Sequence, residues 1–98
     1  HNTAIKETER LTESRKELSE SEIDILNIKL LEILSKIEEK QWITITYFTP
    51  DNIKSGGKYV TKNGYIKKYN EYEHYIVLDN NIKIYIDDII YIDNNIKD

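Results

Sequence analysis

The spacing of the hydrophobic residues changes near residue 42, from a helical repeat to an alternation. Ahead of that point, large aliphatic side chains recur every three or four positions, as on one face of an α-helix. Ser19 and Glu22 stand at the spacing of a capping box, in which each side chain accepts a hydrogen bond from a backbone N–H group at the helix start. The pattern predicts a helix from Ser19 to residues 38–41, whose buried face comprises Ile23, Leu26, Leu30, Ile33, Leu34 and Ile37.

A second, smaller set of aliphatic residues lies on the other side of the predicted helix. Ile25, Ile28 and Leu31 are spaced three residues apart. A helix lying on the end of a small barrel buries one face only, so these three residues must be buried by something other than the barrel. Either residues 1–18 fold back over it, or it is an interface for a partner protein or for a second subunit. The sequence leaves both possibilities open.

From Trp42 onward, hydrophobic and polar residues alternate, which is typical of antiparallel strands with one buried face. Asn80-Asn81 predicts a two-residue turn, because Asn tolerates positive φ. Asn63-Gly64 is either a tight hairpin turn or a bend where a long strand crosses a barrel corner. The predicted fold class is α+β, mostly β, with an N-terminal helix capping a small antiparallel barrel of five strands: 42–48, 58–69, 74–79, 82–86 and 88–92.

The length of 98 residues predicts one domain with short appendages. Residues 1–18 form a charged arm with too little apolar surface to hold a helix against a core, so we expect the arm to be frayed or to depend on a partner. The helix and barrel occupy residues 19–93, and residues 94–98 form a polar tail. Because the chain has no Met, His1-Asn2 is either a tag remnant or the cut end of a longer protein.

Five short segments resemble the YolD-like family of small bacterial and phage proteins in their order and spacing. They are the helix start (18–23), the first strand (43–48), Gly64-Tyr65-Ile66, the third strand (76–78) and the closing segment (84–89). The resemblance implies an Sm-like or SH3-like barrel of five strands and favours the bend at Gly64. It also implies an association with DNA-damage responses and with Y-family DNA polymerases.

The sequence contains no set of residues that points to catalysis. The chain has no Cys and two histidines, His1 and His74. It shows neither a Ser-His-Asp or Cys-His set for catalysis nor a thiolate metal site. Asp87-Asp88 is better explained by turn chemistry than by a metal site, because neighbouring strand residues point to opposite faces. We therefore expect no enzyme activity, no cofactor and no metal. The absence of Cys and of a long apolar run predicts a cytoplasmic protein that does not enter a membrane.

One stretch has a local excess of positive charge although the whole chain has a net charge of −4. No acidic residue occurs from Asn52 to Asn70, and lysines there are interleaved with tyrosines. Lysines that contact phosphate and aromatic rings that stack on bases are typical of single-strand binding surfaces. The same composition is also typical of a solvated edge strand. The candidate contacts are Lys58, Lys62, Tyr65, Lys67, Lys68 and Tyr69.

The preferred hypothesis is a non-enzymatic protein-interaction module that uses Ile25, Ile28 and Leu31. The resemblance implies that its partner is a damage-tolerance DNA polymerase or an accessory protein of one. A homo-oligomer formed through the helix is a further possibility. The alternatives are a barrel that binds nucleic acid or an anionic nucleotide through the lysine–tyrosine stretch, and a phage-encoded inhibitor that blocks a bacterial defence protein.

Overall fold

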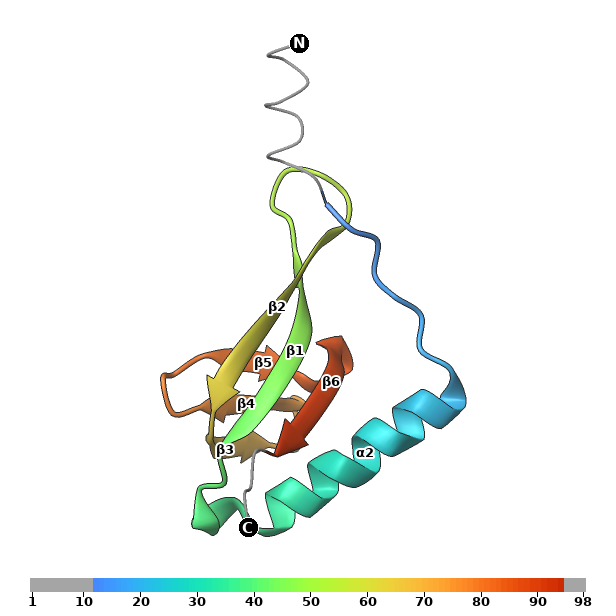
Figure 1. Cartoon of the computed structure of the whole chain (residues 1–98). Helices are drawn as coiled ribbons and strands as arrows, with labels where there is room; N and C mark the ends of the chain where they lie inside the picture. Colours follow the sequence, from blue (N-terminus) through green and yellow to red (C-terminus); the bar gives the residue numbers. More distant parts are fainter. Residues whose placement is uncertain (1–11, 95–98) are drawn as a thin grey trace.

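The computed structural model of the chain describes residues 12–94, which fold into one long helix and two small sheets (Figure 1). The described part is α+β and mostly β, in agreement with the predicted class. Its elements are α2 (Glu20–Ser35), the 3-10 helix η1 (Ile37–Glu39), β1 (Ile43–Pro50), β2 (Gly57–Gly64), β3 (Ile66–Asn70), β4 (Tyr75–Leu78), β5 (Lys83–Tyr85), the 3-10 helix η2 (Ile86–Asp88) and β6 (Ile89–Asn94).

The helix begins with the predicted capping box. The Ser19 hydroxyl accepts a hydrogen bond from the Glu22 N–H (3.2 Å), and the Glu22 carboxylate accepts one from the Ser19 N–H (2.9 Å). The second bond lowers the pKa of the Glu22 carboxyl, because the donor stabilises its ionised form. At the other end, α2 tightens into η1, and Lys40 takes a left-handed conformation (φ 53°) that turns the chain into β1.

The six strands form two antiparallel sheets of three strands, in the orders β2-β1-β6 and β3-β4-β5. In the first sheet β1 is central, and Ile45 pairs with Lys62 on one side and with Ile92 on the other. In the second sheet β4 is central, and Ile76 pairs with Tyr69 and Ile84. The chain crosses between the sheets twice, directly from β2 to β3 and through η2 from β5 to β6.

The prediction of a small barrel of five strands is wrong in strand number, and whether the barrel closes was left open by the sequence. The predicted second strand (58–69) is divided at Tyr65 into β2 and β3, and within residues 12–94 no closed barrel forms. The division occurs at Gly64, where a Cβ atom would lie 2.3 Å from a carboxylate oxygen of Asp79. That oxygen accepts a hydrogen bond from the Tyr65 N–H (3.2 Å). Asn63-Gly64 is therefore a bend between sheets and not a hairpin turn.

The core lies where the two sheets and α2 meet, and its buried side chains are almost entirely aliphatic. Leu30 and Ile33 bury the inner face of α2, and Leu26, Leu34 and Ile37 pack against them, as predicted. Each fully buried aliphatic side chain contributes about 1.5–3 kcal/mol through removal from water. Ile23 differs from the prediction, since it is 43% exposed. The strands and η2 contribute Ile43, Ile45, Ile66, Ile76, Leu78, Ile84, Ile86, Ile89 and Ile92.

The β4–β5 connection has one more residue than predicted. The Leu78 N–H donates to the Ile82 carbonyl (2.9 Å), so Asp79, Asn80 and Asn81 form a three-residue loop. Asn81 alone adopts positive φ (68°). A turn followed by one left-handed residue is a common three-residue hairpin loop, and Asn suits that last position.

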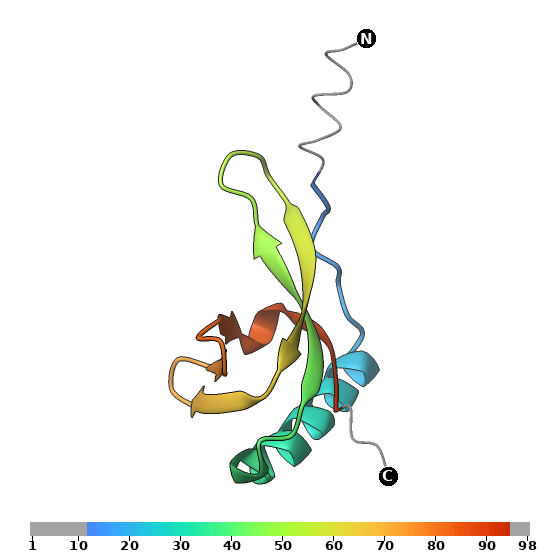
Figure 2. The ribbon, with the colours of Figure 1, turned by 60° about the vertical axis from the view of Figure 1, so that its left-hand side comes forward.

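The β1–β2 hairpin projects past the rest of the molecule, and residues 12–16 run alongside its tip (Figure 2). We call residues 12–16 the clasp. The clasp pairs with the hairpin at Glu13 and Gly57, whose N–H groups each donate to the other's carbonyl (2.6 and 2.9 Å). The Thr12 hydroxyl also donates to the Ser55 carbonyl (2.9 Å). Residues 1–11 of the predicted arm and residues 95–98 of the predicted tail lie outside the described residues.

Candidate functional site

The outer face of α2 carries the three aliphatic residues that the sequence singled out. Ile25, Ile28 and Leu31 are 55%, 65% and 64% exposed, whereas Leu30 and Ile33 on the inner face are 7% and 5% exposed. The described part of the arm does not cover the outer face, because residues 12–16 run to the hairpin instead (Figure 1). We call Ile25, Ile28 and Leu31 the outer stripe.

Acidic side chains accompany the outer stripe. Asp24 and Glu32 lie four residues before and after Ile28, so they occupy the same side of the helix, and both are exposed. The basic residue of α2, Lys29, lies on the flank toward β6, where its ammonium is 3.7 Å from the Asp93 carboxylate. The exposed face of α2 therefore combines an aliphatic centre with negative charge.

The structure divides the lysine–tyrosine stretch between the two sheets. Lys58 and Lys62 lie in β2 and alternate with Tyr59, whose side chain points to the opposite face. Tyr59 is also engaged, because its ring packs edge-on against Phe48 (5.2 Å between centroids) and its hydroxyl accepts a hydrogen bond from the Lys16 N–H (2.5 Å). The lysines and the aromatic ring of β2 do not share one face.

Beyond the bend, the remaining candidates of that stretch have separate surroundings. Tyr65 is half-buried, with the Lys40 ammonium 5.8 Å from its ring centroid. In β3, the Lys67 ammonium donates to the Asn81 side chain, and Tyr69 pairs with the buried Ile76 and is 36% exposed. Of this group, Lys68 lies on the outer face of the β3-β4-β5 sheet, because it pairs with Val77 there.

An aromatic and basic cluster that the sequence pattern did not predict lies on that same outer face. The rings of Tyr75 and Tyr85 meet edge to face (5.7 Å), and the Lys83 ammonium lies 4.3 and 5.1 Å from the two ring centroids. The pKa of Lys83 is raised, first by its hydrogen bond to Tyr85. The pairing of residues 75 and 85 depends on the loop of three residues, whereas the sequence predicted a loop of two, so the cluster was not found.

His74 and the two aspartates lie together at one edge of the molecule. His74 adopts positive φ (65°) in the β3–β4 turn, and its Nδ1 is 3.3 Å from the Asp87 carboxylate. Asp88 instead pairs with Arg15 of the clasp (2.8 Å). Asp87 and Asp88 thus contact different partners from η2, the 3-10 turn that precedes β6. Among residues 12–94, no group of three metal-binding side chains comes together.

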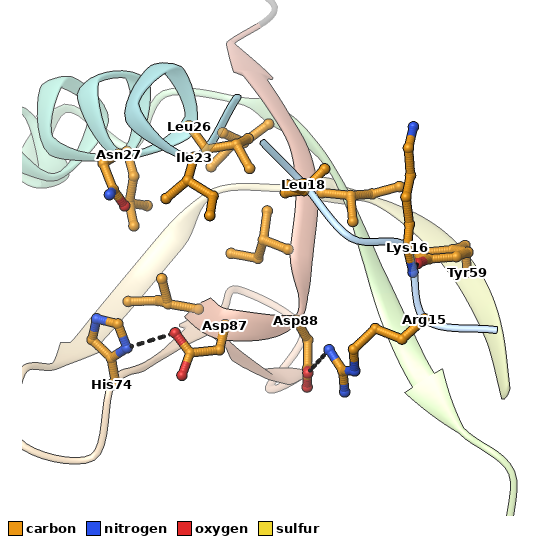
Figure 3. Close-up of a pocket in the computed structure, with 15 residues that line it drawn as sticks. Arg15, Lys16, Leu18, Ile23, Leu26, Asn27, Tyr59, His74, Asp87 and Asp88 are labelled. Carbon is orange, nitrogen blue, oxygen red and sulfur yellow. Dashed lines mark hydrogen bonds and ion pairs between the residues drawn. The ribbon is translucent and has the colours of Figure 1, made fainter. Parts of the chain in front are cut away.

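Beside these ion pairs lies a pocket of about 320 Å³ (Figure 3). Leu18, Ile23 and Leu26 form one wall, and Ile89 and Ile92 from β6 form the floor. The sequence analysis did not find this pocket, although Leu18 and Ile23 stand at the spacing of a hydrophobic staple. A staple alone does not show whether its two side chains fill the space beneath them.

No helix within residues 12–94 has the length and apolar character required to cross a membrane, and α2 has only 16 residues. No protein-family model, no curated protein and no solved structure matches the chain.

Proposed function

We propose that this protein is a non-enzymatic interaction module that docks on a partner protein through the outer stripe of α2. The observation that carries the proposal is the exposure of Ile25, Ile28 and Leu31 on a helix whose opposite face is already buried. Three adjacent aliphatic side chains exposed to water gain free energy when a partner covers them.

The charge around the stripe defines the chemistry of the partner. Asp24 and Glu32 flank Ile28, so a partner segment with Leu or Ile at helical spacing and Lys or Arg beside them is complementary. A second copy of α2 would place acidic residues near acidic residues, which disfavours a homo-oligomer through this face. The resemblance to the YolD-like family makes a damage-tolerance polymerase or its accessory protein the first partner to test, and a bacterial defence protein the second.

The direct test uses two designed amphipathic peptides, one of Leu and Lys and one of Leu and Glu, titrated into the labelled protein. We expect saturable binding of the Leu–Lys peptide and none of the Leu–Glu peptide, with amide shifts confined to α2. Ile28→Asp should abolish binding, because it places an acidic side chain in the middle of the outer stripe, between Asp24 and Glu32. Ile53→Asp is the matched control, since Ile53 is 79% exposed in the β1–β2 loop. Equal binding by both variants, or binding of neither peptide, contradicts the proposal.

A pull-down from host lysate, with and without nuclease, then addresses the partner's identity. Capture of a protein by the wild type and by Ile53→Asp but not by Ile28→Asp, and resistant to nuclease, links that protein to the outer stripe. A change in sedimentation with protein concentration, lost in Ile28→Asp, would instead assign the stripe to self-association.

A second candidate function, binding of single-stranded nucleic acid, is favoured by the outer face of the β3-β4-β5 sheet. Lys68 and Lys83 lie on either side of Val77 there, next to the rings of Tyr75 and Tyr85. This cluster meets the chemical requirement better than the β2 lysines do. We expect binding of an oligonucleotide to weaken with salt and to be lost in the double variant Lys68→Glu, Lys83→Glu. Lys58→Glu, Lys62→Glu is the control. Loss of oligonucleotide binding only in Lys58→Glu, Lys62→Glu would show that the β2 lysines form the binding surface instead.

A further inference from the structure

The pocket beneath the start of α2 is shaped like a site for a small molecule. Its volume of about 320 Å³ falls within the range of small-ligand sites, about 300–1,000 Å³. Apolar cavities of about 150 Å³ lined by aliphatic side chains already take up a benzene-sized molecule. The pocket therefore has room for a compact aliphatic body of about twice that size.

The walls come from three separate parts of the chain. Leu18 projects from the segment between the clasp and α2, and Ile23 and Leu26 project from the first turns of α2 (Figure 3). Ile89 and Ile92 come from β6. All five are aliphatic, so the interior offers contact to hydrocarbon and no hydrogen bond. A ligand gains affinity there by burying an apolar body.

The polar groups lie at the edge. The Asp87 carboxylate is 3.3 Å from His74 Nδ1, and the Asp88 carboxylate is 2.8 Å from the Arg15 guanidinium. Lys16 also lines the pocket, and its ammonium points away from both carboxylates (Figure 3). Asn27, with a neutral amide, stands at the same edge above His74 (Figure 3). A charged head group would have to compete with one of the existing ion pairs and lose water as well. A neutral head group needs only one hydrogen bond.

We propose that this pocket binds a small uncharged amphiphile, with an aliphatic body in the pocket and a hydroxyl or amide head at the edge near Asn27. The site is independent of the outer stripe, which lies on the opposite face of α2. The clasp contributes to the site, because Arg15 and Lys16 line it and the chain that carries Leu18 continues from them.

The test is an NMR titration with three probes that share one body: 1-octanol, octanoate and octylamine. We expect saturable shifts of the amides of Leu26, Asn27 and Ile89 with 1-octanol, and about tenfold weaker binding of both charged probes, reflecting the cost of bringing a charge to the edge of an apolar pocket. Tightest binding of octylamine or octanoate would overturn the assignment of a neutral head. Absence of saturable shifts with all three would overturn the site.

Two filling variants keep the test independent of one mutant's folding. Ile23→Trp fills the pocket from α2 and Leu18→Trp fills it from the segment before α2, so each should weaken 1-octanol binding at least about tenfold. Ile25→Trp, which adds the same ring on the outer face of α2, should bind like the wild type. Unchanged affinity in both filling variants contradicts the proposal. Ile28→Asp should leave 1-octanol binding intact, so failure of the docking proposal and failure of this one are distinguishable.

Discussion

The aliphatic core and the clasp are held together by different kinds of interaction. In the core, twelve buried hydrophobic side chains, eleven of them in one cluster, exclude water, and no polar side chain among residues 12–94 is buried with them. At the clasp, Glu13 pairs with Gly57 through the backbone, and the Arg15 guanidinium, half-exposed, pairs with the Asp88 carboxylate and stacks on the buried Phe48 ring (4.6 Å). The core is stabilised by non-directional burial, whereas the clasp depends on a few directional contacts. The two regions should therefore respond to mutation very differently.

The largest effect should come from the core. Ile45→Ala removes a side chain with no exposed surface, and we expect it to lower the free energy of unfolding by about 2–5 kcal/mol. Urea unfolding followed by the fluorescence of Trp42 measures the loss. Ile53→Ala makes the same change at a residue that is 79% exposed and should cost little. Equal losses at the two positions would contradict the assignment of the core.

A steric change at the hairpin tip should come second. A Cβ atom at Gly57 would lie 2.2 Å from the Thr49 carbonyl oxygen and 2.8 Å from the Phe48 ring, so Gly57→Ala forces the strands apart. We expect a loss of about 1–3 kcal/mol in urea unfolding. At Gly64 the added atom meets only the Asp79 carboxylate, which can rotate away at the cost of its bond to Tyr65. Gly64→Ala should therefore lower the free energy of unfolding by less than Gly57→Ala does. A larger loss for Gly64→Ala would contradict this prediction.

Breaking the clasp by charge should have a smaller effect. Arg15→Ala removes an exposed ion pair and a cation–π contact, which together stabilise by about 1 kcal/mol. Hydrogen exchange at the Gly57 amide, which donates to Glu13, should become faster while the Ile45 amide keeps its protection. Lys29→Ala, which breaks the longer Lys29–Asp93 pair, is the control and should leave Gly57 unchanged. Faster exchange at Ile45 in Arg15→Ala would show that the two regions are coupled.

The smallest effect is a pH dependence at the junction of the two regions, the start of α2. The hydrogen bond from the Ser19 N–H lowers the pKa of Glu22, so the stabilisation is present above the ordinary pKa of 4.5 and is lost as the pH falls through the lowered value. We expect Glu22→Gln to be less stable than the wild type at pH 7, with the difference shrinking toward pH 3. A difference that does not change with pH would exclude the carboxylate as its cause.

The sequence predicted the parts of the fold that depend on local chemistry. The capping box at Ser19, the inner face of α2 and the alternation in β1 each involve residues a few positions apart, so periodicity was enough. The number of strands was predicted wrongly and closure of the barrel was left open, because both depend on how the edges of two sheets meet. The pairing of Glu13 with Gly57 was not predicted at all, since nothing local relates two residues so far apart in the chain.

For the candidate sites, the sequence predicted composition better than arrangement. Ile25, Ile28 and Leu31 are exposed among the described residues, and their role as an interface stays a prediction. The lysine–tyrosine stretch does not lie on one surface, because the bend at Gly64 carries half of it to the other sheet. The pocket and the Tyr75–Tyr85 cluster needed contacts between segments that only the folded chain brings together.

The position of β6 has a consequence for the chain during its synthesis. β6 pairs with the central strand β1 and contacts α2, yet it follows the other described strands in the chain. Until residues 89–94 leave the ribosome, α2 lacks the strand that it packs against most extensively. The nascent helix then exposes aliphatic residues on both sides, which favours capture by a chaperone or association with another nascent chain. Pairing of β6 with β1 then covers the inner face of α2, and the outer stripe stays exposed.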